Sequence, residues 1–549
     1  MIDFQTKPDN YSHWRIEFND DIATLIMDVS PDATLVPGYE LKMNSYDLGV
    51  DIELNDALQR IRFEHPEVKT VVITSGNEKI FCAGANIKML GLSSHAHKVN
   101  FCKFTNETRN SIEDSSQVSG LKFIAAVNGT AAGGGYELAL AADEILLVDD
   151  GNSAVSLPEV PLLAVLPGTG GLTRVVDKRK VRRDRADIFC SIEEGVRGEK
   201  AVSWRLIDQS IPKSKFTESV QARAKELAST SSRPGGVGCQ LNALNRTISE
   251  TSVEYSTVSV AIDHDKRSAT VTIKTNGASV PSNAEAALSE GDQFWPLRLT
   301  RELDDAILHL RANETLEGNI IFKSEGDMDA VMAADAFLQA NSSHWFINEV
   351  IAYWKRVMKR VDVSSRSLFT LVEPGSCFGG FVAELVFAAD RSYMLEGQFE
   401  GDDRPEAKIR LSAMNFGALP MSNGITRLAT RFLGEPESVT NAENMIGEKI
   451  EASQANELGL ITDALDDIDW EDEVPMAIGL RANYSPDALT GMEANLRFAG
   501  PETMETKIFG RLTAWQNWIF QRPNAVSPNG GALQVYGSGV RPTYDYNRV

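Results

Sequence analysis

NGTAAGGGYELALAAD, residues 128–143, places three consecutive glycines ahead of an apolar run with the composition of a helix. Glycine in a helix or strand interior costs about 0.5–1 kcal/mol relative to alanine, so three together indicate that something approaches the bare backbone closely. The preceding run, LKFIAAV, is typical of a strand. The first N–H groups of a helix are unpaired and carry partial positive charge. The stretch therefore predicts a strand, a glycine turn and a helix N-terminus suited to a developing oxyanion.

Two other interpretations of the glycines are considered. Close packing of the helix on the strand would require small residues in the same places. A dinucleotide-binding turn would require the pattern G-x-G-x-x-G, which fails because position 138 is leucine. Packing and oxyanion binding both remain open on this stretch alone.

Two further stretches have features that favour catalysis. In KIFCAGANIKML (79–90), a β-like run meets a turn of small residues, where the Ala85 N–H would be exposed. In VSLPEVPLLAVLPGTGGLTR (155–174), Glu159 lies in an apolar loop, and an apolar environment raises a carboxyl pKa towards values useful for proton transfer. A plain tight turn and an exposed loop glutamate are the respective alternatives.

The sequence repeats itself. SLFTLVEPGSCFGGFVAELVFAADRSYM (367–394) resembles residues 122–148, and several other segments match in the same order. β-like runs alternate with helical patterns throughout, which predicts an α/β fold. We expect two fused units, 1–250 and 251–549, with helical C-terminal segments and a loop-rich tail. The segment CQLNALNRTISE (239–250) is predicted to be helical.

Composition excludes several classes of protein. The net charge of −23 argues against a nucleic-acid binder. There is no long apolar run that could span a membrane. The five cysteines include no C-x-x-C pair, which favours a reducing compartment without disulfides or zinc. Because the first residues also lack the apolar core of a secretory signal, we expect a cytoplasmic protein.

Together the three stretches resemble the enoyl-CoA hydratase/isomerase (crotonase) superfamily, in the segments AGAN, NGTAAGGGYE and LPEVPLLAVLPGTGG. The resemblance implies a CoA-thioester substrate whose carbonyl oxygen accepts from the N–H groups of Ala85 and Gly134. It also implies that Glu137 and Glu159 handle water and protons. Asn86 departs from the aspartate usual in the family.

The resemblance is weaker over the second copy. There EGDMDAVMAAD replaces the AGAN turn, and GSCFGGFVAE keeps only a pair of glycines, although Glu384 falls near the place of Glu137. The implied fold is therefore two ββα-superhelix units, of which the second is degenerate and is not a second active centre.

The length and the doubled layout resemble the benzoyl-CoA-dihydrodiol lyase family. That resemblance implies opening of an oxygenated, non-aromatic benzoyl-CoA ring (a dihydrodiol or an epoxide), with release of formate and an aliphatic CoA semialdehyde. An ordinary enoyl-CoA hydratase/isomerase and a catalytically silent CoA-binding scaffold remain as alternatives. No nicotinamide, flavin or metal motif is present, so no cofactor is expected beyond the CoA of the substrate. We expect a homo-oligomer, with a dimer favoured.

The basic run DKRKVRRDR (177–185) is the last feature of note in this acidic chain. It could hold CoA phosphates, or it could form a solvated helix face or a subunit contact. The second interpretation is favoured.

Overall fold

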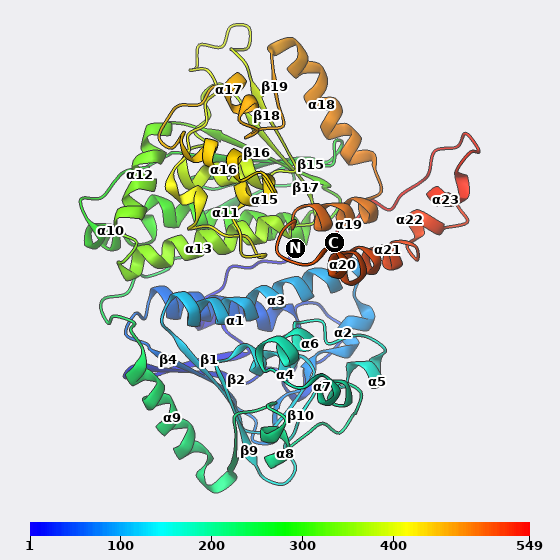
Figure 1. Ribbon diagram of the computed structural model, residues 1–549. Helices are drawn as coiled ribbons and strands as arrows, with labels where there is room; N and C mark the ends of the chain where they lie inside the picture. The colour runs from blue at the N-terminus through cyan, green and yellow to red at the C-terminus, as the bar shows by residue number, and fades with distance from the viewer. The chain divides into compact units, whose positions relative to one another are not determined.

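The computed structural model describes residues 1–549 and divides into two compact units, Ile2–Ala243 and Leu244–Val549, here called the first and second units. Figure 1 shows that each unit contains its own sheet covered by helices. None of the helices combines the length and apolar character needed to cross a bilayer.

The first unit is built on a six-stranded sheet in which one antiparallel pair is followed by parallel strands. Parallel strands buried on both faces carry continuous apolar runs, and Val71, Val72 and Ile73 are an example. In order across the sheet, the strands are β1 (Trp14–Asn19), β2 (Ile22–Met27), β4 (Thr70–Ser75), β7 (Lys122–Val127), β9 (Glu144–Asp149) and β11 (Gln209–Pro212).

A second, short sheet positions the functional residues. Each of its strands directly follows a strand of the main sheet: β5 (Ile80–Cys82), β8 (Thr130–Ala132) and β10 (Val155–Ser156). A helix directly follows β8 and β10, whereas β5 is followed first by the two-residue strand β6 (Gly84–Ala85) and then by a helix. The predicted α/β class is confirmed.

Helices cover the main sheet on both faces. The amphipathic helix α9 (Phe216–Thr230) buries Phe216, Val220 and Ala224 against alternate residues of the strands. Helices α1 (Leu48–Phe63) and α3 (His95–Val118) pack against each other beside the sheet (Figure 1).

The second unit has an eight-stranded sheet in which three successive antiparallel pairings are followed by parallel strands, whereas the first unit has one antiparallel pairing. Helix α18 (Asp467–Asn483) covers one face through Trp470 and Val474, among others. Its strands are β12 (Thr247–Ile248), β13 (Ser252–Glu254), β14 (Val258–Asp263), β15 (Ser268–Lys274), β16 (Asn319–Glu325), β17 (Ser367–Val372), β18 (Arg391–Leu395) and β19 (Asp463–Leu465).

The helix predicted for residues 239–250 is wrong. Apart from the short strand β12 (Thr247–Ile248), the segment has no regular secondary structure. Its backbone is paired with the end of α1 instead: Cys239 N–H donates to Phe63 O at 2.7 Å, and Leu241 N–H donates to the Glu64 carboxylate at 2.8 Å. Those tertiary bonds satisfy backbone groups that a helix would otherwise pair internally.

The tail contains two short helices, α22 (Pro523–Val526) and α23 (Ala532–Val535), and loops between and after them. Beyond residue 543 the chain returns to the body of the second unit. Arg548 is 2% exposed and donates to Glu493 Oε2 at 2.8 Å. This end of the tail is therefore part of the buried structure of the second unit.

Candidate active site

The three glycines form the turn between β8 and α4 (Gly134–Ala141). Gly133 precedes the helix with a φ of 53°, a conformation that glycine adopts without steric cost. Its N–H donates to Ser156 O at 2.9 Å, which fixes the turn against β10. As the first residue of α4, Gly134 has an N–H that no carbonyl of its own helix accepts.

A different group occupies the space beside each of these glycines. A Cβ at Gly133 would lie 2.7 Å from Glu159 Oε1, and one at Gly134 would collide with the hydroxyl oxygen of Tyr46. A Cβ at Gly135 would collide with the carbonyl oxygen of Cys82. No side chain fits at any of the three positions, so the run of glycines serves both packing and the approach of polar groups.

The turn at Ala85 contacts the glycine turn. Gly84 and Ala85 form β6, which pairs in parallel with β3 (Ser45–Tyr46). A Cβ at Gly84 would lie 2.9 Å from the Gly134 nitrogen, so only glycine allows the two turns to approach this closely. Asn86 N–H donates to Tyr46 O at 2.9 Å. Since successive N–H groups of a strand point to opposite sides, the Ala85 N–H faces away from β3.

Asn86 is the N-cap of α2 (Ile87–Leu92), and its side-chain oxygen accepts from Met89 N–H at 2.9 Å. Its amide nitrogen donates to Glu40 O at 2.8 Å and to Ser45 Oγ at 3.1 Å. An aspartate could form the cap but could not donate to the Glu40 carbonyl. These contacts use both the acceptor and the donor of the asparagine side chain.

Glu137 is almost fully buried, and the loop before α6 (Gly171–Thr173) binds its carboxylate. Oε1 accepts from Thr169 N–H at 3.0 Å and from Gly171 N–H at 2.7 Å, while Oε2 accepts from the Thr169 hydroxyl. Burial raises the pKa of Glu137, and these three hydrogen bonds oppose the rise by stabilising the ionised form. The carboxylate is thus held in one orientation.

Glu159 is the first residue of the short helix α5 (Glu159–Leu163) and differs from Glu137 in having no hydrogen-bond partner at Oε2. Burial raises its pKa to about 7, with a smaller contribution from the charge of Glu137. A carboxyl group with a pKa close to neutrality can both donate and accept a proton at physiological pH. The structure therefore brings Glu137, Glu159, Ala85 and Gly134 into one neighbourhood around the N-terminus of α4.

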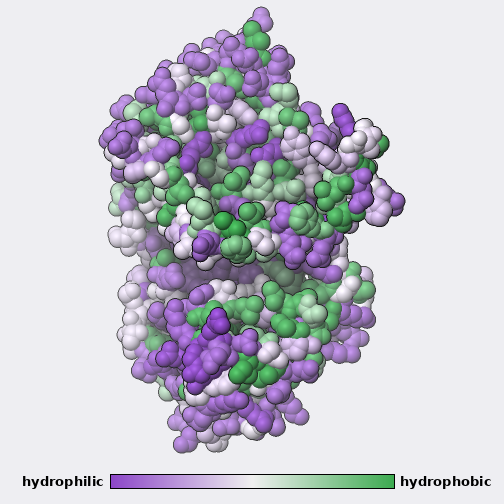
Figure 2. Space-filling view, turned by 45° about the vertical axis from the view of Figure 1, so that its right-hand side comes forward, coloured by the Kyte–Doolittle hydropathy of each residue, from purple (hydrophilic) through white to green (hydrophobic).

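Exposed apolar side chains follow Glu159 along the chain. Leu162 and Leu166 are 55% and 64% exposed, and Val160 and Val165 are exposed as well. Figure 2 shows hydrophobic clusters of this kind interrupting an otherwise hydrophilic surface. Exposed apolar residues beside a candidate site suit a substrate with an apolar part.

Two residues near the turn were not identified from the sequence. Thr169 lies in the GTGG segment, where the glycines drew attention and the hydroxyl did not. Tyr46 belongs to no recognised motif, and only the fold brings it to Gly134. A search for hydroxyl residues within the glycine-rich segments would have found Thr169.

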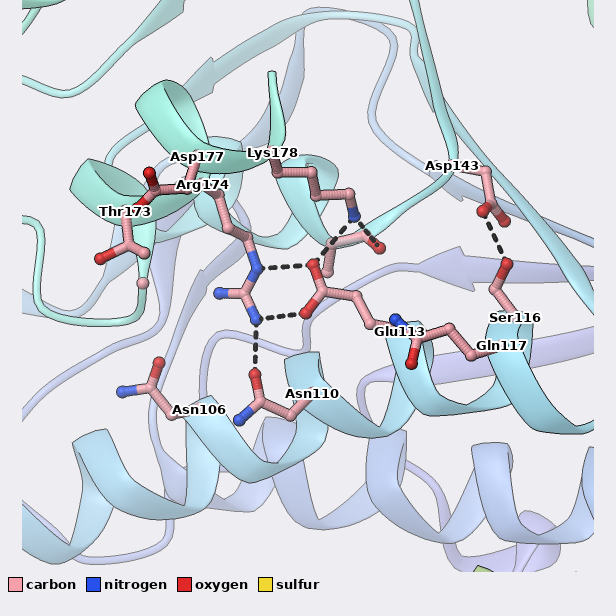
Figure 3. Close-up of a pocket in the computed structure, with 12 residues that line it drawn as sticks. Asn106, Asn110, Glu113, Ser116, Gln117, Asp143, Thr173, Arg174, Asp177 and Lys178 are labelled. Atoms are coloured by element: carbon pink, nitrogen blue, oxygen red, sulfur yellow. Dashed lines mark hydrogen bonds and ion pairs between the residues drawn. The ribbon is translucent and has the colours of Figure 1, made fainter. Parts of the chain in front are cut away.

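A polar cleft of about 560 Å³ lies behind the loop that binds Glu137, between α3 and the helices that begin at Gly171. Figure 3 shows its central contacts: Arg174 donates to both oxygens of Glu113 and to Asn110, and Lys178 donates to Glu113. Arg174 also donates to Thr169 O at 3.1 Å. The cleft side chains thus support the loop that holds Glu137.

The basic run 177–185 is largely paired within the chain. Arg179 bonds to Asp208 and Arg182 to Asp184. Lys178 is held by Glu113. These pairings favour the interpretation as a solvated or structural face over that of a phosphate site.

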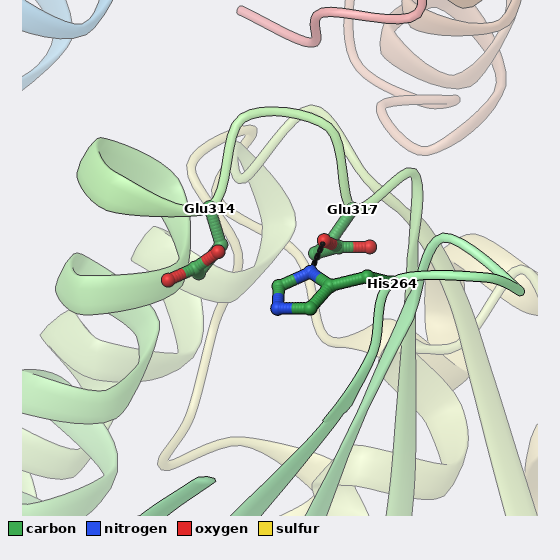
Figure 4. A group of neighbouring side chains, drawn as sticks. All are labelled: His264, Glu314 and Glu317. Carbon is green, nitrogen blue, oxygen red and sulfur yellow. Dashed lines mark hydrogen bonds and ion pairs between the residues drawn. The ribbon is translucent and has the colours of Figure 1, made fainter. Parts of the chain in front are cut away.

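His264, Glu314 and Glu317 of the second unit form the one group of side chains with metal-ligand chemistry. Figure 4 shows His264 Nδ1 directed at Glu317, at 2.7 Å. The other ring nitrogen contacts Glu250 O at 3.1 Å. Because both nitrogens already have protein partners, the group is explained as a contact between the β14–β15 hairpin and the loop before β16.

The chain is similar to several known proteins. The family model described as "Enoyl-CoA hydratase/isomerase" matches residues 40–271. The chain is 57% identical to "Benzoyl-CoA-dihydrodiol lyase" of Aromatoleum evansii, over all of this chain and 98% of that protein. It is 30% identical to "Carnitinyl-CoA dehydratase" of Salmonella typhi, over 39% of this chain and 76% of that protein. An enoyl-CoA hydratase structure from Geobacillus kaustophilus is 32% identical, with 40% and 75% of the chains covered and a TM-score of 0.35.

Residues 40–271, which include both turns, match the enoyl-CoA hydratase/isomerase family model. Within that class, the chain belongs to the benzoyl-CoA-dihydrodiol lyase family. It is an enzyme, a lyase.

Proposed function

We propose that the first unit catalyses opening of the oxygenated, non-aromatic ring of a benzoyl-CoA dihydrodiol or epoxide. Water is consumed, one carbon leaves as formate, and the remaining carbons form an aliphatic CoA semialdehyde. The identity of 57% along the whole length with a benzoyl-CoA-dihydrodiol lyase supports this substrate class.

The thioester carbonyl oxygen is proposed to accept hydrogen bonds from the N–H groups of Ala85 and Gly134. The two turns are in contact, and both N–H groups lack a partner within their own helix or neighbouring strand. Negative charge that develops on this oxygen in an enolate-like state is stabilised there. Loss of one donor from a known oxyanion hole costs about 2.7–4 kcal/mol of transition-state stabilisation.

Glu159 is proposed to transfer the proton at the ring. It is the only one of the two glutamates with an unpartnered oxygen, and its pKa of about 7 suits both acid and base steps at neutral pH. Its carboxylate lies against Gly133, one residue from the Gly134 N–H. This adjacency of a free carboxyl group and an oxyanion donor is the observation that carries the proposal.

Glu137 is proposed to hold and activate the attacking water. Its three hydrogen bonds fix the carboxylate and favour its ionised form. A carboxylate has about four lone-pair sites, so one remains to accept from a water. Glu137 is held by three hydrogen bonds, whereas Glu159 has an unpartnered oxygen, and this difference of environment suits two carboxyl groups with separate roles.

The proposal is tested by incubating purified protein with oxygenated benzoyl-CoA and analysing the products by mass spectrometry, with a separate formate assay. We expect an open-chain CoA semialdehyde and one formate per ring opened. Efficient hydration of crotonyl-CoA without formate release would instead identify an ordinary hydratase. Binding of CoA esters without any turnover would identify a scaffold.

The second unit is proposed to be a degenerate copy of the first without an active centre. Gly380, like Gly133, has a positive φ, of 49°, and donates its N–H to a neighbouring strand-like segment, at Arg410 O. The next N–H, that of Phe381, corresponds to the Gly134 N–H. It donates to Asp335 Oδ2 at 2.7 Å. A carboxylate of the chain itself thus takes the place that the thioester oxygen is proposed to take in the first unit.

The two glutamates have also changed in the second unit. Glu384, the counterpart of Glu137, is buried in a salt bridge with Arg427 at 2.8 Å. Arg427 in turn bonds to Asp362 at 2.6 Å. In the first unit, Glu159 lies three residues after Ser156, whose carbonyl accepts from the Gly133 N–H. The residue three positions after Arg410, which accepts from the Gly380 N–H, is Ala413. No group for proton transfer remains there.

The chain is also proposed to form a homodimer. The CoA thioester is proposed to be the only partner that binds at the site. Light scattering coupled to size-exclusion chromatography gives the mass of the particle directly. A mass of one chain would contradict it.

A further inference from the structure

The Tyr46 side chain is buried without a hydrogen-bond partner for its hydroxyl. It is 1% exposed, and the oxygen contacts no donor or acceptor. Buried hydroxyl groups in folded proteins are nearly always paired. Tyr136, on α4, follows that rule, because its hydroxyl donates to Leu206 O at 2.6 Å. The Tyr46 hydroxyl therefore needs an explanation.

Tyr46 touches both turns of the candidate site. Its backbone pairs with Ala85 across β3 and β6, and its carbonyl accepts from Asn86 N–H. Its hydroxyl lies where a side chain at Gly134 would begin. One residue thus links the strand that carries the first proposed donor to the helix that carries the second.

The surroundings hold the ring in place and keep the hydroxyl protonated. Phe101 packs against the ring with centroids 5.7 Å apart, and the Arg109 guanidinium lies 5.4 Å from the ring centroid. Arg109 is itself fixed by a buried salt bridge with Asp51. Burial raises the pKa of Tyr46 well above its usual value, so the group stays a neutral donor over the whole physiological range.

The groups next to the hydroxyl determine what it can bind. The hydroxyl lies beside Gly134, whose N–H is one of the two proposed donors and has no lone pair to offer. The hydroxyl and the two proposed N–H donors could be satisfied together by an oxygen that carries negative charge, such as an enolised thioester carbonyl.

We propose that the Tyr46 hydroxyl is a third hydrogen-bond donor to the thioester carbonyl oxygen. The proposal rests on the proposed function of the first unit. It explains why a buried hydroxyl is unpartnered in the free protein, since its partner arrives with the substrate.

The test is Tyr46→Phe, which removes the hydroxyl and keeps the ring. We expect kcat to fall about 10²-fold or more, as for other oxyanion donors, with little change in KM. The melting temperature is expected to stay the same or rise, because no hydrogen bond is lost in the free protein. The matched control is Tyr136→Phe. It loses a hydrogen bond and should melt at a lower temperature while the folded enzyme keeps its kcat.

A second measurement separates this proposal from that of the overall reaction. The infrared carbonyl band of bound benzoyl-CoA, labelled with ¹³C at the thioester, reports polarisation without any turnover. We expect a shift to lower frequency in the wild type and a smaller shift in Tyr46→Phe. Equal shifts, or an unchanged kcat, would overturn the role of Tyr46. A shift that is smaller in Tyr46→Phe than in the wild type, in a protein that releases no formate, would uphold Tyr46 and reject the ring-opening reaction.

Discussion

The hydroxyl of Tyr46 fills the space in which a side chain at Gly134 would begin. Strand β3 and helix α4 are therefore packed as tightly as a residue without a side chain permits. This contact sets the position of the Gly134 N–H relative to β6, and the whole candidate site is built around it.

Gly134→Ala is expected to lower both stability and activity. The added methyl group must displace the Tyr46 ring, and overpacking of this kind costs about 1–3 kcal/mol. Thermal unfolding and kcat measure the two effects. Tyr46→Phe removes the nearest atom, so the double variant should recover part of the lost melting temperature.

Gly479→Ala is the matched control for that substitution. Gly479 lies in α18, and its Cβ would meet no atom within 4 Å. Alanine in a helix is favoured over glycine by about 0.8–1 kcal/mol, so this variant should be at least as stable as the wild type. If both glycine variants behave alike, the packing against Tyr46 is not the cause.

Glu159→Gln is expected to abolish ring opening and to change the pH dependence of stability. The pKa of Glu159 is raised to about 7 in the folded protein, so its contribution to stability is fully present below the unfolded pKa and is lost as pH rises through 7. Glutamine does not ionise. The melting temperature of the variant minus that of the wild type should therefore increase as the pH rises from 5 to 8, as measured by scanning calorimetry. A constant difference across that range would contradict the raised pKa.

Thr169→Val tests the support of Glu137. The substitution removes the hydroxyl bond to Oε2 and leaves both backbone donors in place. Hydrogen bonds to charged groups contribute about 1.5–3 kcal/mol, so kcat should fall roughly tenfold or more. Because the lost bond favours the ionised carboxylate, the acidic limb of the pH–rate profile should move to higher pH. Thr169→Ser keeps the hydroxyl and should keep the wild-type profile.

Parallel substitutions in the two units test which of them is catalytic. Glu137→Gln should abolish turnover. Glu384→Gln should leave kcat of the folded enzyme unchanged but destabilise the second unit, since breaking a buried ion pair costs up to about 3–5 kcal/mol. Steady-state kinetics and thermal unfolding of both variants distinguish the roles. Loss of turnover in a folded Glu384→Gln variant would show that the second unit takes part in catalysis.

Asn86→Asp restores the residue usual in the family. The side chain can still cap α2, but the donor to Glu40 O is lost and a negative charge faces that carbonyl. An unsatisfied buried group costs about 1–3 kcal/mol, so the melting temperature should fall. An equally stable variant would show that the amide contact contributes nothing.

Much of this molecule could be predicted from local patterns. The alternation of β-like and helical segments indicates the α/β class, and the glycine turn indicates a helix N-terminus free of side chains. The apolar surroundings of Glu159 in the sequence also indicate a raised pKa, which agrees with the value of about 7.

The contacts that complete the site could not be predicted in this way. Tyr46 and Thr169 meet α4 from segments distant in sequence, and no periodicity encodes such a meeting. The helix prediction for residues 239–250 is wrong for the same reason, because hydrogen bonds to the end of α1 override the helical composition of the segment. Tertiary pairing decides where local preference is weak.

The bond from Phe381 N–H to Asp335 has a consequence for how a duplicated enzyme can lose an activity. A buried N–H donor that no longer has a ligand is left without an acceptor, and an unpaired buried donor destabilises the fold. On the proposal that the second unit descends from an active ancestor, a resident carboxylate took over the vacated place. The N–H donor then keeps an anionic partner, but the contact now stabilises the fold and no longer serves a reaction.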